Sequence, residues 1–370
     1  MPASIAFNST LWPVLAIVFA LVLVLSWALS RLGRLSGIGH DKSEGVQKVH
    51  TRPTSRLGGV GIAMGLVLGT GLVAAGHIQH EVSQVLFWLC VAALPVWLGG
   101  LAEDLTHRVG PSLRLVLAMV SAAWLYAATG VGVLHTDVWP VDQLLRVPGA
   151  SLCLTLLVVA GFTHSVNIKD GFHGLASGVC MVMFAGIGAL AWSAGDMLVV
   201  QLCLVGLAAT AGFFAVNWPG GKLFLGDAGA YLLGFWVVEL GLLLVMRNPG
   251  LSPMAVVVVG IVPLIETLFS MYRRRVVRNH PVNHPDALHL HTLIYRRLVC
   301  KALPPGADKA KANARVAIYF WLASATWAAL AWLLRSNTPA QLGLMLLYLL
   351  AYLWLYRRLV RFAASPRTRP

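Results

Sequence analysis

Eleven apolar runs, each long enough to cross a lipid bilayer, constrain this chain more than any other feature. A helix needs about 20 apolar residues to span the hydrocarbon core. Charged residues make up only 11% of the chain, against about a quarter in soluble domains. The sequence predicts an all-α, polytopic membrane protein with about 11 transmembrane helices, forming one integral-membrane domain over residues 1–370. The runs lie at 11–32, 58–76, 82–101, 113–133, 151–167, 175–194, 197–216, 229–246, 254–272, 314–334 and 339–356.

The cations predict the orientation of these spans. With the N-terminus outside, the inside segments hold 25 of the 28 Lys and Arg residues, and the outside loops hold only Arg146, Arg247 and Arg335. Cytoplasmic loops carry an excess of Lys and Arg, so we expect a cytoplasmic C-terminus. The expected cytoplasmic loops are 33–57, 102–112, 168–174, 217–228 and 273–313.

The net charge of +14 would suggest a nucleic-acid partner in a soluble protein. Here the cations mark cytoplasmic loops, so we expect no nucleic acid and the membrane as the main partner. The five Cys residues show neither CxxC nor metal-ligand spacing. We therefore expect no disulfide framework.

Three carboxylates from distant parts of the chain reach the same expected membrane depth. Asp104, Asp170 and Asp227 lie at or beside the ends of the third, fifth and eighth spans. Carboxylate oxygens suit Mg²⁺ or Mn²⁺, which are held by one or two carboxylates together with substrate phosphates. Each acid singly fits a helix cap or a solvated loop, and Asp227 fits an N-cap. Jointly they favour an active site at one membrane face.

A glycine-rich turn precedes one expected helix. Gly220-Gly221-Lys222 is followed by Gly226-Asp227-Ala228-Gly229. Such a turn presents unpaired N–H groups at a helix N-terminus, which suit a phosphate, and Lys222 adds a cation. The alternative interpretation is close helix packing at small residues.

His289 and His291 stand out in the long loop 273–313. Two His separated by one residue share a face on a strand or turn and diverge on a helix. Phosphate hydrogen bonding or acid–base work is the preferred interpretation over a zinc site, which would lack Cys partners. Glu239 and Glu266 lie within spans, where acids are functional candidates, and Glu266 is close enough to the inside end to reach the site.

Five short motifs, in order along the chain, resemble those of the polyprenyl-phosphate N-acetylhexosamine-1-phosphate transferases, which form glycosyltransferase family 4. The motifs are the segment from His50 through Arg56 to Gly59, the pair Glu103-Asp104, Asn167 to Gly171, Phe224 to Asp227, and His289 to His291. The family includes O-antigen-type GlcNAc-1-phosphate transferases and, more distantly, phospho-MurNAc-pentapeptide transferase.

The resemblance implies Mg²⁺-dependent transfer of an N-acetylhexosamine 1-phosphate from a UDP-sugar to polyprenyl (undecaprenyl) phosphate, with release of UMP. Mn²⁺ is the alternative ion. The setting would be a bacterial inner membrane, with a periplasmic N-terminus and a cytoplasmic active site, and a homodimer is a further expectation. The product would start an O-antigen-like glycan.

The resemblance also implies roles for individual residues. Asp227 and Asp104 would hold the metal, and the catalytic residues would be Asp104, Asp170, His289 and His291. Asp104 would act as the base for the lipid phosphate or as a competing nucleophile. The substrate-binding residues would be Asn167, Asn217, His50, Arg56, Lys222, His173 and Glu103.

Three departures from the family pattern leave alternatives open. Glu103 replaces the first acid of an Asp-Asp pair, Lys169 precedes Asp170 where an apolar or acidic residue is usual, and His173 occupies a position often Asp or Asn. They raise an altered sugar choice, or a catalytically idle homologue in a glycan-assembly complex. A secondary transporter is the alternative from another class, but transporter sites lie near the bilayer midplane.

Overall fold

The computed structural model describes residues 11–36, 39, 54–76, 80–277, 288–302 and 309–361. Within them the regular structure is helical, with no β-strand. The α-helices are α1 (Leu11–Ser36), α2 (Gly58–Ala75), α3 (His80–Thr106), α4 (Pro111–Thr129), α5 (Trp139–Leu145), α6 (Ala150–Lys169), α7 (Leu175–Ala194), α8 (Met197–Asn217), α9 (Gly226–Arg247), α10 (Pro253–Val259), α11 (Ile261–Tyr272), α12 (Leu290–Ile294), α13 (Lys309–Leu333) and α14 (Thr338–Arg361). Short π- and 3₁₀-helical turns are η1 (Arg273–Val277), η2 (Tyr295–Val299) and η3 (Cys300–Ala302).

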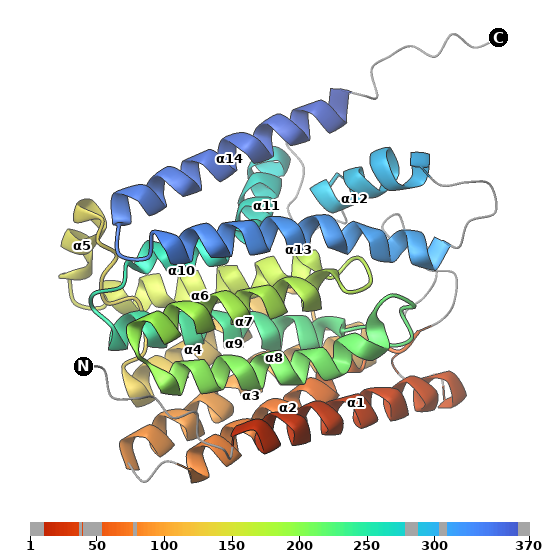
Figure 1. The fold of residues 1–370 in the computed structure, drawn as a ribbon, viewed down its shortest axis with the longest axis horizontal. Helices are drawn as coiled ribbons and strands as arrows, with labels where there is room; N and C mark the ends of the chain where they lie inside the picture. The colour runs from red at the N-terminus through yellow and green to blue at the C-terminus, as the bar shows by residue number, and fades with distance from the viewer. Residues whose placement is uncertain are drawn as a thin grey trace.

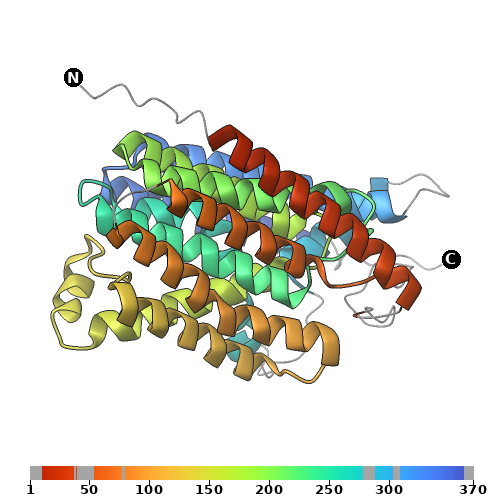
Figure 2. The same ribbon diagram turned by 90° about the horizontal axis from the view of Figure 1, so that it is seen from below.

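The predicted class, an all-α polytopic membrane protein, is confirmed. Ten of the described helices are long and apolar enough to cross a membrane, or up to 11 if the bent pair α10–α11 counts as one span. Figure 1 shows them running side by side, with α1 starting towards one end of the bundle and α14 ending at the other. Figure 2 shows α4 and α6 together on one side of the bundle.

Helix α9 lies at the centre of this bundle. It packs against α2, α3, α6, α7, α8 and α10, and nearly all its residues are buried. Small residues make this possible, because backbones separated only by Gly or Ala can approach closely. A Cβ atom at Gly59 of α2 would collide with the backbone of Gly229, and one at Gly100 of α3 would collide with the backbone of Ala228. The start of α9 is therefore held between α2 and α3.

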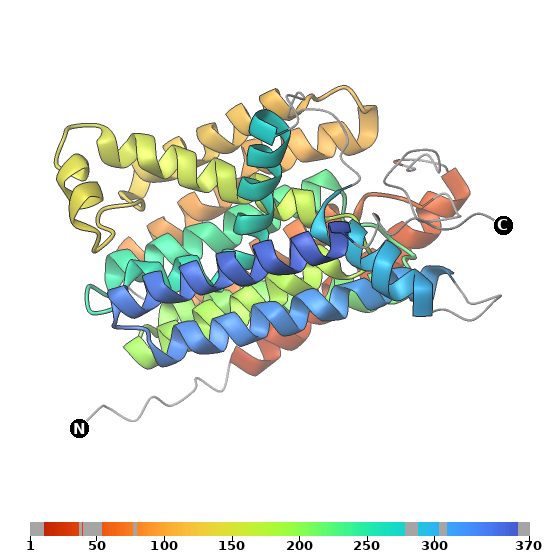
Figure 3. The same ribbon diagram turned by 90° about the horizontal axis from the view of Figure 1, so that it is seen from above.

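The predicted ninth span, 254–272, is not one straight helix. It consists of α10 and α11, whose axes differ by 77° across Gly260. A side chain at Gly260 would meet the ring of Phe162 on α6, and Pro263 removes one backbone donor from the first turn of α11. Figure 3 shows α11, in teal, standing across the direction of α13 and α14.

All five predicted loops are helical in part, most clearly 102–112 and 273–313. Helix α3 continues to Thr106, so Glu103 and Asp104 belong to its last turns and not to the loop 102–112. The Thr106 hydroxyl donates to the Ala102 carbonyl at 2.6 Å, and the Val109 N–H donates to Glu103 Oε2 at 2.7 Å. Within 273–313, the described residues form η1, α12, η2, η3 and the start of α13. Hydropathy missed these turns because their apolar stretches are short.

Candidate active site

A short backbone pairing brings two distant loops together at one end of the bundle. The Phe224 N–H donates to the Ser55 carbonyl at 2.9 Å. The Gly58 N–H donates back to the Phe224 carbonyl at 3.0 Å. Arg56 stands between these contacts and therefore lies beside the first turn of α9.

Asp104 is tied to the N-terminus of α9 through the backbone. Its Oδ1 accepts the N–H of Asp227 at 2.9 Å, and its Oδ2 accepts the N–H of Ala228 at 2.8 Å. The first N–H groups of a helix have no partner within the helix and favour an anion. The sequence predicted a phosphate at this N-terminus, whereas the anion found on these two amides is Asp104, whose side chain is fully buried.

Asp227 is the centre of a charged network, which we name the Asp227 cluster: Arg56, Asp104, Arg114, Asn167 and Asp227. Its Oδ1 accepts from Arg56 Nη2 at 2.9 Å and from Asn167 Nδ2 at 3.0 Å, and its Oδ2 pairs with Arg114. Arg56 Nε also lies 3.2 Å from Asp104 Oδ1. Two guanidinium groups and two carboxylates thus meet at one helix start, which concentrates charge where phosphates could be bound.

The turn before this cluster requires glycine at one position. Gly226 has a φ of +71°, in the left-handed region that disfavours side chains. A Cβ there would collide with the Arg56 carbonyl and lie 2.6 Å from Asp104 Oδ2. The glycine therefore allows the Arg56 segment and Asp104 to reach α9 together.

A second set of contacts joins the α6–α7 turn to the α8–α9 turn. Asn217 Oδ1 accepts the Gly174 N–H at 2.7 Å, and its Nδ2 donates to the Leu223 carbonyl at 2.7 Å. The His173 N–H donates to Asn313 Oδ1 at 2.8 Å. The His173 Nδ1 atom lies 3.1 Å from the Pro219 carbonyl, so the described contacts of this residue are within the protein. Both side chains are buried. These two side chains therefore hold the turns before α7 and α9 in place.

We expect Asn217→Ala to destabilise the protein rather than to weaken one substrate selectively. The change leaves one buried N–H and one buried carbonyl without partners, at about 1–3 kcal/mol each. The melting temperature of the detergent-solubilised protein should fall. A normal melting temperature with a raised KM for the nucleotide substrate would instead support direct nucleotide binding by Asn217.

The rings of His289 and His291 lie on the same side of the chain. His289 has extended backbone angles just before α12, and His291 lies in its first turn. Their rings stack with centroids 5.2 Å apart and planes inclined by 10°. A Cβ atom on Gly171, next to Asp170, would lie 3.5 Å from His291 Nε2. The histidine segment therefore packs against the end of α6.

His291 is neutral in the folded protein. Burial lowers the pKa of its imidazole well below its ordinary value; His289 and Lys169 lower it further, whereas Glu266 raises it. The unfolded chain binds a proton as the pH falls through about 6.5. The contribution of the neutral His291 to the free energy of unfolding is therefore complete above that pH. Below it, this contribution declines by at most about 1.4 kcal/mol per pH unit.

Accordingly, we expect His291→Gln to flatten the dependence of stability on pH between 7.5 and 5.5. The measurement is the melting temperature of wild type and variant across this range. Parallel curves for the two proteins would contradict a buried neutral imidazole at position 291.

The predicted site residues fall into distinct places. Asp104, Asp227, Asn167 and Arg56 come together in the Asp227 cluster, and Asp170 is half-buried at the end of α6. Lys222 is exposed, and Glu103 accepts a backbone N–H of the α3–α4 turn. His50 lies outside the described residues.

Sequence reasoning missed Arg114 at the start of α4. Its guanidinium pairs with Asp227 and lies 5.4 Å from the centroid of the Tyr231 ring. The available signal was its position: it is a cation at the second residue of the expected fourth span, 113–133. Composition alone does not distinguish such a residue from one that sets topology.

The carboxylate oxygens of the Asp227 cluster are the kind of ligand that Mg²⁺ prefers, but the cluster offers few of them. Among the described residues, no three His, Cys, Asp or Glu side chains are grouped as a metal site. Mg²⁺ needs few protein ligands, because it retains waters and takes oxygens from substrate phosphates. Asp227 Oδ2 pairs with Arg114, so this carboxylate could exchange a guanidinium for a cation.

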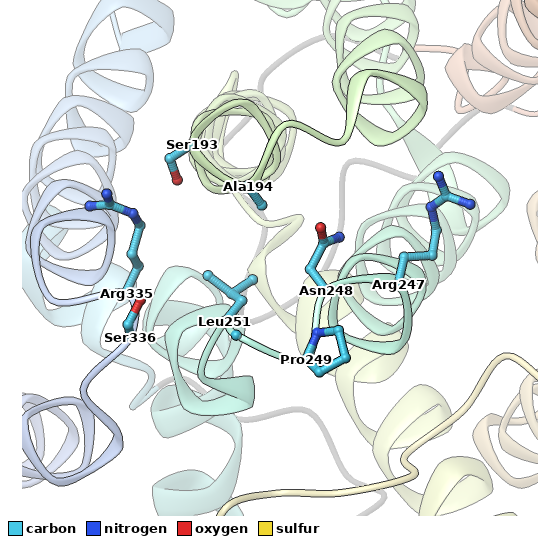
Figure 4. A pocket seen from close by; sticks show the side chains of 9 residues that line it. Ser193, Ala194, Arg247, Asn248, Pro249, Leu251, Arg335 and Ser336 are labelled. Carbon is cyan, nitrogen blue, oxygen red and sulfur yellow. The ribbon is translucent and has the colours of Figure 1, made fainter. Parts of the chain in front are cut away.

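A cavity of about 420 Å³ lies at the other end of the bundle from the Asp227 cluster. Figure 4 shows Arg247 and Arg335 on opposite sides of it, with Asn248 and Leu251 between them. Arg247 Nε donates to Asp196 at 2.7 Å, and Arg335 Nη1 donates to the Trp332 carbonyl at 3.2 Å. These contacts account for both arginines as partners of helix ends.

The fold and the cluster define a polytopic membrane protein with a buried, charged centre at one end of its bundle. Residues 86–245, which contain Asp104, Asn167, Asp170 and Asp227, match the model of glycosyl transferase family 4. The predicted family resemblance is thereby confirmed.

Several curated proteins are similar over most of the chain. A probable undecaprenyl-phosphate N-acetylglucosaminyl 1-phosphate transferase of Bacillus subtilis is 27% identical over 271 residues, 73% of each chain. A phospho-N-acetylmuramoyl-pentapeptide-transferase of Shouchella clausii is 27% identical over 303 residues, 74% of this chain and 88% of the relative. The undecaprenyl-phosphate alpha-N-acetylglucosaminyl 1-phosphate transferase of Escherichia coli K12 is 26% identical over 259 residues, 68% and 67% respectively.

Proposed function

We propose that this protein transfers an N-acetylhexosamine 1-phosphate from a UDP-sugar to a polyprenyl phosphate, with undecaprenyl phosphate as the acceptor, and releases UMP. The observation that carries the proposal is the Asp227 cluster, which joins four helices at one end of a membrane bundle. The names of the relatives support both the donor group and the lipid acceptor. The product would start an O-antigen-like, lipid-linked glycan.

The reaction brings two phosphate-bearing molecules together. An oxygen of the lipid phosphate attacks the sugar-linked phosphorus of the UDP-sugar, the bond from that phosphorus to the bridging oxygen breaks, and the bridging oxygen leaves with UMP. A phosphate monoester carries a charge of about −1.5 to −2 at pH 7, so the attacking oxygen needs little help from a base. The main requirement is to offset repulsion between anions.

Arg56 and Arg114 are suited to that task. Both guanidinium groups are within the Asp227 cluster, with side chains 21% and 11% exposed. Partial burial strengthens their interaction with a phosphate because the local dielectric is lower than that of water. They would exchange part of their contact with Asp227 for the diphosphate of the donor.

Mg²⁺, with Mn²⁺ as the alternative, would be held by Asp227 together with substrate phosphates, and when bound it would shield the charge that develops on their oxygens. Asp104 orients Asp227 by accepting the Asp227 N–H, and Asn167 orients the Asp227 carboxylate. The metal role predicted for Asp104 remains a proposal, and the backbone contacts favour anchoring over proton transfer.

The other predicted catalytic residues lie near the end of α6. Asp170, His289 and His291 would line the substrate side at the end of α6, where His291 packs beside Gly171. The excess of cations at this end of the bundle supports a cytoplasmic active site in a bacterial inner membrane, with the N-terminus on the periplasmic side. A homodimer remains an expectation.

The test is UMP release by the purified protein with undecaprenyl phosphate, Mg²⁺ and each common UDP-N-acetylhexosamine. Mass spectrometry of the lipid product identifies the sugar. Absence of UMP with every donor, from protein that remains folded, would refute the proposal. Added chelator should abolish release if the metal is required.

The position of the cluster disfavours the transporter alternative. Transporter sites lie near the bilayer midplane, whereas this cluster is at helix ends. The acid nearest the middle, Glu239, is fully buried in α9, and among the described residues nothing hydrogen-bonds to either of its oxygens. The idle-homologue alternative gains no support from Lys169, because that side chain is directed into the protein and paired with Glu266.

A further inference from the structure

A fully buried ion pair, Lys169–Glu266, lies at the end of α6, next to Asp170. Lys169 Nζ is 2.9 Å from Glu266 Oε2, and each side chain is 1% exposed. Lys169 ends α6, and its ammonium group also lies 4.1 Å from the centroid of the Phe320 ring. Glu266 belongs to α11, the helix that turns across the bundle after Gly260.

The second oxygen of Glu266 reaches the histidine segment. Its Oε1 accepts the Leu290 N–H at 2.7 Å and lies 3.4 Å from His289 Nδ1. One carboxylate therefore contacts the last residue of α6 on one side and the start of α12 on the other. Leu290 is the residue between the two histidines, so its backbone position fixes both.

The other attachment of this segment comes from the same part of the chain. Arg273 Nη1 donates to the Leu288 carbonyl at 2.6 Å and to the Tyr356 hydroxyl at 2.6 Å. Arg273 thus fixes the chain before the histidines, whereas Glu266 fixes the chain between them. Glu266 also contacts α6, which carries Asn167, through Lys169.

We propose that Glu266 is a positioning residue: by accepting the Leu290 N–H it fixes the histidine segment relative to the Asp227 cluster, and Lys169 at the end of α6 is its charge partner. Asn167 donates to Asp227, Lys169 is two residues further on, and Glu266 connects Lys169 to the Leu290 amide. The inference rests on the proposed function, since positioning has meaning only if both groups act on one substrate. It also explains Lys169 as part of this connection instead of as a sugar-selecting residue.

Two double variants separate positioning from bulk stability. Lys169→Met with Glu266→Gln removes both charges and keeps an oxygen that can accept the Leu290 N–H. Lys169→Met with Glu266→Leu removes both charges and also the acceptor. Neither leaves a single buried charge, which would be strongly destabilising. The two variants therefore differ in the acceptor that faces the Leu290 N–H and His289 Nδ1.

The first readout is hydrogen exchange of the peptide that contains Leu290, and it does not depend on activity. We expect the Gln variant to match wild type and the Leu variant to exchange at least about tenfold faster at this amide, because a lost hydrogen bond removes its protection. Peptides from α9 should be unchanged in both. Unchanged exchange at Leu290 in the Leu variant would overturn the proposal.

The second readout is UMP release at saturating donor and acceptor. The Leu variant should lose kcat by roughly tenfold to a hundredfold, in line with misplacement of a reacting group by about 1 Å, while the Gln variant stays within about threefold of wild type. The KM for the UDP-sugar should change much less than kcat. Faster exchange at Leu290 with an unchanged kcat would refute a positioning role. Wild-type protein that releases no UMP would refute the proposed function, and the exchange measurement would still decide whether Glu266 holds the segment.

Discussion

Asp227→Asn is expected to lower UMP release by roughly 10²- to 10³-fold, with little change in folding. The substitution keeps the size of the side chain but removes its charge. It also places an amide donor where Asp227 now accepts from Arg56, Asn167 and Arg114. Arg114 then loses its counter-charge, Arg56 keeps Asp104, and a cation loses its carboxylate ligand. The measurement is the initial rate of UMP release from purified protein at saturating substrates.

Glu239→Gln is the matched control for this prediction. It is the same kind of change on the same helix, 12 residues further along, or about 18 Å away at the helical rise. We expect its rate to remain within about threefold of wild type, since the site does not include Glu239. A rate for Asp227→Asn above about a tenth of wild type would show that the cluster is not the reaction centre.

Gly226→Ala is expected to be the most damaging single-methyl change in the described chain. The left-handed backbone costs a side chain about 1–2 kcal/mol, and the new Cβ would also collide with the Arg56 carbonyl and crowd Asp104. Either Arg56 or Asp104 must then move away from α9. We expect UMP release to fall by about a hundredfold, together with a lower melting temperature.

Gly71→Ala, in α2, serves as its control, because no atom lies within 4 Å of a Cβ at that position. Ala in a helix interior is favoured over Gly by up to about 1 kcal/mol, so this variant should be as stable as wild type or slightly more so. If both glycine variants keep full activity, the close approach of Arg56, Asp104 and α9 is not needed for the reaction.

Much of the fold follows from the sequence because lipid imposes a simple requirement. Backbone N–H and carbonyl groups in a bilayer need hydrogen-bond partners within their own helix. Each long apolar run could therefore be interpreted as one span. Hydropathy carries no information about direction, and it therefore missed the 77° turn between α10 and α11. That turn depends on Gly260 fitting against Phe162, a contact between residues far apart in the chain.

The site was only partly predictable for a related reason. Asp104 and Asp227 could be selected because acids are few in this sequence, whereas Asn167 was selected through the family resemblance. Their connections could not be predicted, since Asp104 binds backbone amides, which every residue has. Arg114 was hidden because topology is a simpler explanation for a loop arginine. Glu266 could be named as a functional candidate, but its partners Lys169 and Leu290 could not be predicted. Distances between helices, not residue types, distinguish them.

The Lys169–Glu266 pair also bears on how the protein is assembled in the membrane. A helix carrying an unpaired acid enters lipid reluctantly, and α11 carries Glu266. Lys169 is 97 residues nearer the N-terminus, so α6 is synthesised before α11. Until α11 inserts, the Lys169 ammonium group can lie at the membrane interface. We expect insertion of α11 to be more favourable beside α6, where Lys169 pairs with Glu266. The chain thereby acquires a check on helix order during biogenesis, before any substrate is bound.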